Sequence, residues 1–138
     1  MLGTPEARHE ERWAYDRAMG LLQMLELAPY ADQVASSLAF GLQRRLEIAR
    51  ALASEPELLL LDEPAAGLNP TEKRQLLSLI KRLQEQGLTI LLIDHDMRFV
   101  MPVSTRVIVL DHGQKIAEGP PEAVQQDVRV IEAYLGKP

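Results

Sequence analysis

The sequence predicts an α/β fold in which a mostly parallel sheet with flanking helices follows a helical portion. Two short apolar segments, residues 58–61 and 89–93, are typical of strands buried on both faces of a parallel sheet. A helical pattern lies between them, which gives the strand, helix, strand order of a right-handed parallel crossover. Residues 1–54 show helical periodicity instead.

Two helices are predicted in that first part. Apolar residues recur every three or four positions over residues 6–27, and Pro29 follows the end of this pattern. A polar connection leads to a second helix that begins near Leu42 and closes at Ser54-Glu55-Pro56, because a residue before proline avoids the helical conformation. On the first helix we interpret Trp13 and Tyr15 as packing residues. On the second helix we interpret the arginines as a charged face exposed to solvent: Arg44, Arg45 and Arg50.

The crossover helix has clear end signals. Asn69 is a good N-cap, Pro70 suits the first helical position, and Gly87 suits the position after a helix that runs to about Gln86. Beyond the second strand we expect a short helix over residues 96–100. The sequence His112-Gly113 then predicts a hairpin between two strands, and helical pieces over residues 121–126 and 128–135 end the chain.

Length and composition fit one soluble globular unit. The 138 residues contain 46% hydrophobic and 25% charged residues, and the formal net charge of −5 gives no general attraction to nucleic acid or anionic lipid. No cysteine is present, which excludes disulfides and cysteine-ligated zinc, and no apolar run approaches the ~20 residues of a membrane span. We divide the chain into a helical portion, an α/β portion and closing helices: residues 1–54, 55–119 and 120–138.

Three polar residues follow the predicted parallel strands. Asp62 and Glu63 come directly after the first strand and His95 follows the second, so all three are expected at the same sheet edge, where ligands of α/β proteins gather. One carboxylate there can hold Mg²⁺ together with substrate phosphates, while a second can activate an attacking water. The plainer alternative is a solvated acidic turn beside a structural histidine, which is the commoner situation for any one such residue.

A second candidate is Gly41, which precedes the second helix. Exposed amides at a helix N-terminus can bind phosphate. The alternative is an ordinary turn glycine.

Four segments, taken in order, resemble the nucleotide-binding subunit of ABC transporters. They are LAFGLQRR at residues 38–45, LLLLDEP at 58–64, GLNP at 67–70 and DHD at 94–96. The resemblance implies a partial P-loop NTPase-like (ABC ATPase) fold that includes part of the helical subdomain. Within the family, the segments around these motifs and the closing AYLG are similar to the subunit of branched-chain amino-acid importers.

The resemblance also implies roles for individual residues. Asp62 matches the Mg²⁺-binding aspartate of Walker B, Glu63 the catalytic carboxylate and His95 the switch histidine that contacts the γ-phosphate. Asn69 belongs to the D-loop between paired subunits. The signature loop, which contacts the nucleotide of the paired subunit, departs from Leu-Ser-Gly-Gly-Gln by Ala39, Phe40 and Leu42; its candidate nucleotide-binding residues are Leu38, Ala39, Phe40, Gly41 and Gln43.

The phosphate-binding P-loop is missing, because no G-x-x-x-x-G-K-[ST] occurs in the sequence. We therefore expect the chain to be the C-terminal part of an ATP-binding subunit that cannot by itself bind or hydrolyse ATP. In the whole subunit the resemblance implies ATP and Mg²⁺ as cofactors, a second ATPase subunit and transmembrane permease subunits as partners, and a cytoplasmic position on the inner face of the plasma membrane. Two alternatives are a non-catalytic interaction fragment and a relative of DNA-repair ATPases, although the net charge and the lack of coiled-coil heptads disfavour the latter.

Overall fold

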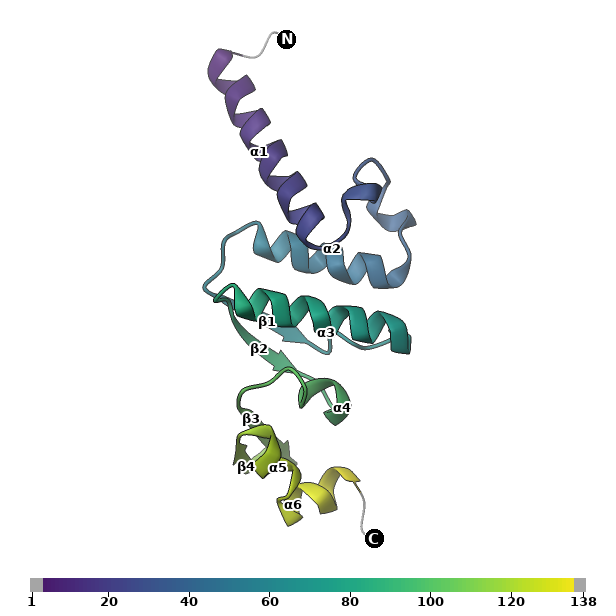
Figure 1. Cartoon of the computed structure of the whole chain (residues 1–138), viewed down its shortest axis with the longest axis vertical. Helices are drawn as coiled ribbons and strands as arrows, with labels where there is room; N and C mark the ends of the chain where they lie inside the picture. Colours follow the sequence, from purple (N-terminus) through teal and green to yellow (C-terminus); the bar gives the residue numbers. More distant parts are fainter. Residues whose placement is uncertain (1–3, 136–138) are drawn as a thin grey trace. The chain divides into compact units, whose positions relative to one another are not determined.

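The computed structural model describes residues 4–135 and divides the chain into two units, with the boundary between Ile93 and Asp94 (Figure 1). In the first unit the elements are α1 (Pro5–Met24), η1 (Ala28–Tyr30), η2 (Ala35–Ser37), α2 (Phe40–Leu52), β1 (Leu58–Asp62), α3 (Pro70–Glu85) and β2 (Thr89–Ile93). The second unit contains α4 (Met97–Val100), β3 (Val107–Asp111), β4 (Gln114–Gly119), α5 (Pro121–Gln125), α6 (Val128–Val130) and η3 (Ile131–Leu135). The three-part division predicted from the sequence stays a prediction.

The predicted parallel pairing is confirmed in the first unit. β1 and β2 run parallel, with Leu58 opposite Thr89 and Asp62 opposite Ile93. The crossover helix α3 begins with Asn69 as its N-cap and is followed by Gly87 at φ +92°, as its end signals predicted. Figure 1 shows α3 over this pair of strands, and the helix is anchored by four buried side chains: Leu76, Leu79, Ile80 and Leu83.

The prediction that β1 and β2 are buried on both faces is wrong for this structure. Burial alternates along β1, so that Leu59 and Leu61 are buried whereas Leu58 and Leu60 remain 50% and 64% exposed. Leu91 and Ile93 of β2 are also more than half exposed. Paired residues of parallel strands share a face, so these four side chains form one apolar surface that no segment within residues 4–93 covers. We call Leu58, Leu60, Leu91 and Ile93 the open sheet face.

Helix α1 also differs from expectation. It buries none of its residues, and Trp13 and Tyr15, interpreted above as packing residues, are 62% and 64% exposed. The chain becomes buried only after the helix, at Leu25 and Leu27. No helix among the described residues is both long enough and apolar enough to cross a bilayer.

The second unit contains the predicted hairpin. β3 and β4 pair antiparallel around His112-Gly113, and both turn residues have positive φ. One side of the hairpin contributes buried Val107, Val109 and Ala117 to a core that also contains Val124 and Val130. The hydroxyl of Tyr134 donates to the carbonyl oxygen of Leu110 at 2.7 Å, which ties the last described helical turn to β3.

Candidate functional site

The acidic pair lies where the sequence predicts it, at the C-terminal end of β1. Asp62 is the last residue of the strand and its side chain is exposed. Glu63 follows in the left-handed region at φ +44°, and its backbone N–H donates to the carbonyl oxygen of Ile93 at 2.8 Å. This hydrogen bond extends the β1–β2 ladder by one residue, so that the backbone of Glu63 is fixed by the sheet.

Asp62 borders a cavity of about 170 Å³ between α2 and β1, whose lining includes Arg44, Glu47 and Pro64. The described residues contain no group of three metal-ligating side chains. A magnesium ion that takes one carboxylate from the protein and its other ligands from nucleotide phosphates and water fits such a donor set, because Mg²⁺ in nucleotide sites is bound in this way. Asp62 is the residue that would supply the carboxylate.

His95 belongs to the second unit, two positions after the last residue of β2. Its side chain is 76% exposed, and Nδ1 lies 3.9 Å from Oδ1 of the almost fully buried Asp94. Oδ1 of Asp94 also accepts the N–H of Asp96 at 2.9 Å, so Asp94 organises the turn that carries the histidine. The expected convergence of His95 with Asp62 and Glu63 stays a prediction.

The predicted nucleotide-binding loop forms the start of α2. Leu38 is buried, Ala39 is the N-cap without a side-chain hydrogen bond, and Phe40 is half exposed. Gly41 is buried in the first turn of the helix. Nε2 of Gln43 turns back to donate to the carbonyl oxygen of Leu38 at 2.9 Å, so this amide stabilises the loop from inside.

Asn69, which the sequence predicts to bind nucleotide, is also the N-cap of α3. Its side-chain oxygen accepts the N–H groups of Thr71 and Glu72, both at 2.9 Å, while a carboxylate oxygen of Glu72 accepts the N–H of Asn69 at 2.9 Å. This reciprocal arrangement is a capping box, which fixes the D-loop segment to the N-terminus of α3.

Arg45 corrects the expectation that the arginines of α2 form a solvated face. Its side chain is only 11% exposed, and Nη1 donates to Oε2 of Glu26 at 3.0 Å. Arg82 of α3 donates to the other oxygen of the same carboxylate at 3.2 Å. The pKa of Glu26 is lowered, chiefly by the hydrogen bond from Arg82 and then by Arg45, against an opposing effect of burial. Sequence reasoning missed Glu26 because its partners lie on other helices.

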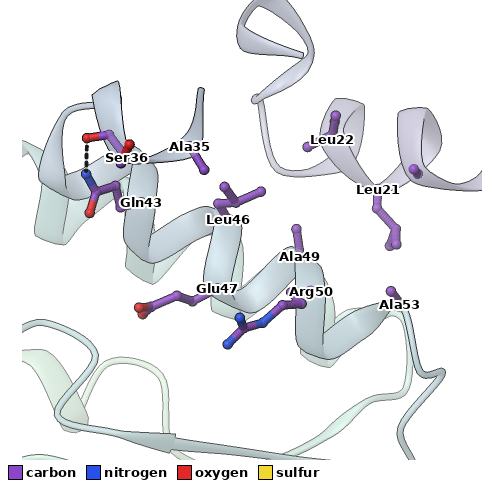
Figure 2. Close-up of a pocket in the computed structure, with 11 residues that line it drawn as sticks. Leu21, Leu22, Ala35, Ser36, Gln43, Leu46, Glu47, Ala49, Arg50 and Ala53 are labelled. Atoms are coloured by element: carbon purple, nitrogen blue, oxygen red, sulfur yellow. Dashed lines mark hydrogen bonds between the residues drawn. The ribbon is translucent and has the colours of Figure 1, made fainter. Parts of the chain in front are cut away.

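A further cavity, bordered by neither member of the acidic pair, lies in the helical part of the first unit. It has a volume of about 600 Å³ and separates α1 from α2, with Leu21 and Leu22 on one side and Leu46 and Ala49 on the other (Figure 2). Of the predicted site residues only Gln43 lines it. Its lining is mostly apolar but also includes Ser36, Glu47 and Arg50, and neither Asp62 nor Glu63 borders it.

Two family models match the chain. The ABC transporter model matches residues 3–66, and the model for branched-chain amino acid ATP-binding cassette transporters matches residues 114–138. The high-affinity branched-chain amino acid transport ATP-binding protein LivG of Escherichia coli is 48% identical over 99% of this chain and 54% of its own length. BraF of Pseudomonas aeruginosa, with the same description, is 46% identical over 97% of this chain and 53% of its own length.

Solved structures agree with these relatives. An ATP-binding cassette of an ABC transporter in its ADP conformation superimposes with a TM-score of 0.81 at 31% identity, over 90% of this chain and 50% of that one. An ABC transporter solved in an inward-facing conformation gives a TM-score of 0.81 at 30% identity, over 90% and 49% of the two chains. The chain thus spans about half the length of the relatives it matches. It has a partial ABC ATPase fold and is a homologue of the ATP-binding subunits of branched-chain amino-acid ABC transporters.

Proposed function

We propose that this chain supplies the signature loop, the Walker B carboxylates and the switch histidine of an ATPase that drives import of branched-chain amino acids. The observation that carries the proposal is the fixed acidic pair at the end of β1 in a chain 48% identical to a branched-chain amino-acid transport ATP-binding protein. In this function Asp62 binds Mg²⁺ on the nucleotide, Glu63 orients and deprotonates the attacking water, and His95 contacts the γ-phosphate.

The signature loop acts on a different nucleotide in this proposal. Residues 38–43 and Asn69 contact ATP that a second ATPase subunit holds, and permease subunits convert closure of the pair into transport. The assembly lies on the cytoplasmic face of the plasma membrane through those permeases. The 138 residues contain no P-loop, and the backbone amides and lysine of that loop hold most of the phosphate charge in such enzymes. The isolated chain is therefore inactive, and hydrolysis requires a P-loop from another polypeptide segment.

The test is a chimaera in which these residues replace the matching segment of the Escherichia coli relative, which brings its own P-loop. We expect the chimaera to hydrolyse ATP and to restore leucine uptake in cells that lack the relative. Glu63→Gln should lower kcat roughly a hundredfold or more, because a carboxamide cannot accept the water proton. Glu57→Gln, a change of the same kind at an exposed position just before β1, is the matched control. Full activity of the Glu63→Gln chimaera would contradict the assignment.

A second measurement examines the isolated chain. Calorimetric titration with Mg-ATP should give no binding at micromolar concentrations. Micromolar affinity would mean that the 138 residues contain another phosphate site. The proposal that the P-loop must come from another polypeptide segment would then be incorrect.

The open sheet face favours one other function. Four exposed apolar side chains on a parallel sheet are unusual, because parallel sheets are covered on both faces. A non-catalytic fragment that binds an ATP-binding subunit through this face would use them without any hydrolysis. If the chimaera is inactive while the isolated chain co-purifies with the intact relative, and threonine at Leu60 and Leu91 abolishes this binding, the second function is favoured.

A further inference from the structure

The two carboxylate oxygens of Glu72 reach two different segments of the chain. Oε2 accepts the N–H of Asn69 at 2.9 Å, and Oε1 lies 2.7 Å from the position that a Cβ atom on Gly41 would occupy. Such an approach is possible only beside glycine, since real Cβ atoms do not come so close to a neighbour. One acidic side chain therefore contacts both the D-loop segment (residues 67–70) and the signature segment (residues 38–43).

A second close approach joins the same two segments, and here the side chain comes from the signature segment and reaches the D-loop segment. Cε1 of Phe40, in the signature segment, lies 3.0 Å from the position of a Cβ atom on Gly67 in the D-loop segment. Gly67 also has φ +76°, a backbone conformation that favours glycine, and a Cβ atom there would need the Phe40 ring to shift by a few tenths of an ångström. The guanidinium carbon of Arg44 lies 5.1 Å from the centroid of the Phe40 ring and supports it from α2.

The space around Glu72 allows its side chain to move. A cavity of about 50 Å³ lies between α2 and α3, and its lining includes Gly41, Leu68, Glu72 and Leu76. Glu72 itself is half buried. The side chain can turn away from Gly41 into this space while the buried leucines of α3 stay in place. The contact can thus be broken without unfolding the helix.

We propose that Glu72 is a positioning residue that couples the signature segment to the D-loop segment, so that both reach a paired subunit in one fixed arrangement. The inference rests on the proposed function for its consequence, but the coupling itself is a property of this chain alone. One carboxylate oxygen of Glu72 accepts the N–H of Asn69, and the other lies where a Cβ atom at position 41 would displace it. Movement of either segment therefore displaces the carboxylate that contacts the other.

Hydrogen exchange of the full 138-residue chain tests the coupling without nucleotide. Glu72→Ala should raise exchange about tenfold at Asn69, and by a similar factor at Leu42 and Gln43, whose amides bond to Ala39 in the signature segment. Glu72→Gln keeps an oxygen that can accept the Asn69 N–H and should behave like the parent chain. Glu85→Ala, an exposed glutamate at the end of the same helix, is the matched control. Faster exchange confined to the D-loop segment and α3 would reduce Glu72 to a helix cap and overturn the proposal.

Gly41→Ala gives an independent test. The new Cβ atom should push Glu72 aside and raise exchange at Asn69, although Asn69 is far away in sequence. In a Glu72→Ala background the same methyl group finds room, so Gly41→Ala should add nothing at Asn69. Equal effects in the two backgrounds would overturn the coupling.

The chimaera with the Escherichia coli relative shows the consequence for catalysis. Glu72→Ala should lower kcat about tenfold and leave KM for ATP unchanged, because the P-loop is untouched, and Glu72→Gln should restore kcat. The positioning role would be overturned if kcat were unchanged in the Glu72→Ala chimaera. It would also be overturned if KM for ATP rose by the same factor as kcat fell. An inactive parent chimaera would contradict the proposed function, while the exchange measurements would still decide the coupling.

Discussion

The guanidinium group of Arg82 donates two hydrogen bonds to Oε1 of Glu26, both at 3.2 Å, across 56 residues of sequence. Arg45 donates to Oε2 of the same carboxylate at 3.0 Å. Glu26 lies in the turn after α1 and itself has a positive φ of 59°. One carboxylate therefore ties this turn to α2 and to α3, and its charge should contribute to the stability of the first unit.

The first prediction concerns this carboxylate. The pKa of Glu26 is lower in the folded chain than its ordinary value of 4.5, chiefly because Arg82 and Arg45 stabilise the charged form. Its stabilising contribution is therefore fully present above the unfolded pKa and is lost as pH falls through the folded pKa. We expect Glu26→Gln to lower the free energy of unfolding by less than about 1 kcal/mol at pH 7, because the carboxylate is half exposed. The loss should be smaller still at pH 3. Urea unfolding at both pH values measures this.

Glu57→Gln is the control for that experiment, since Glu57 is exposed and carries the same charge. A pH dependence of unfolding that is identical for the parent and the Glu26→Gln chain would show that the two arginines contribute no stability through this charge.

The second prediction concerns the β3–β4 turn. His112 and Gly113 have φ values of 45° and 78°, the signs that a type I′ turn requires at both central positions. Asn accepts the left-handed conformation more readily than His. In thermal unfolding, His112→Asn should therefore raise the free energy of unfolding of the second unit by about 0.5 kcal/mol. Gly113→Ala should lower it by about 1 kcal/mol, because a Cβ atom is strained at this φ. A destabilised His112→Asn chain would exclude this turn as the strained element.

Elements with local signals could be predicted from the sequence. Asn69, Pro70 and Gly87 act on their own neighbours, so both ends of α3 were predicted to within one residue. His112-Gly113 specified the hairpin for the same reason. The acidic pair was placed at a strand end because Asp62 and Glu63 directly follow the leucine run of β1.

Features that depend on distant residues could not be predicted in this way. A run of leucines indicates a strand but not what covers it, and Leu58 and Leu60 are exposed because no described segment of the first unit packs on them. Arg45 resembled a solvated helix residue until the fold brought Glu26 to it. The sequence offered Gly41 as a phosphate-binding residue or a turn glycine, but it could not show that Glu72, from another segment, lies where a Cβ atom at position 41 would be.

The third prediction compares the two sides of the β1–β2 sheet. Leu79 of α3 is 2% exposed, so Leu79→Ala should destabilise the first unit by about 2–5 kcal/mol. Leu91→Ala removes a side chain that is 51% exposed and should cost less than about 1 kcal/mol. Chemical denaturation of the two variants decides the point. Similar losses would mean that the open sheet face is covered in solution.

The last prediction concerns association of the isolated chain through the open sheet face. Exposed leucines on neighbouring parallel strands offer an apolar surface next to unpaired strand edges, which favours self-association. Replacing Leu60 and Leu91 by threonine introduces β-branched side chains, which suit strands, and puts hydroxyl groups in place of apolar atoms at the surface. We expect light scattering to show a smaller apparent mass for the double variant at equal concentration, with an unchanged unfolding midpoint. Threonine at two exposed apolar residues outside the sheet, Val34 before η2 and Val128 in α6, should leave the mass as it is. An equal reduction in both variants would mean that association depends on general surface hydrophobicity, whereas a selective reduction identifies the open sheet face as the contact surface.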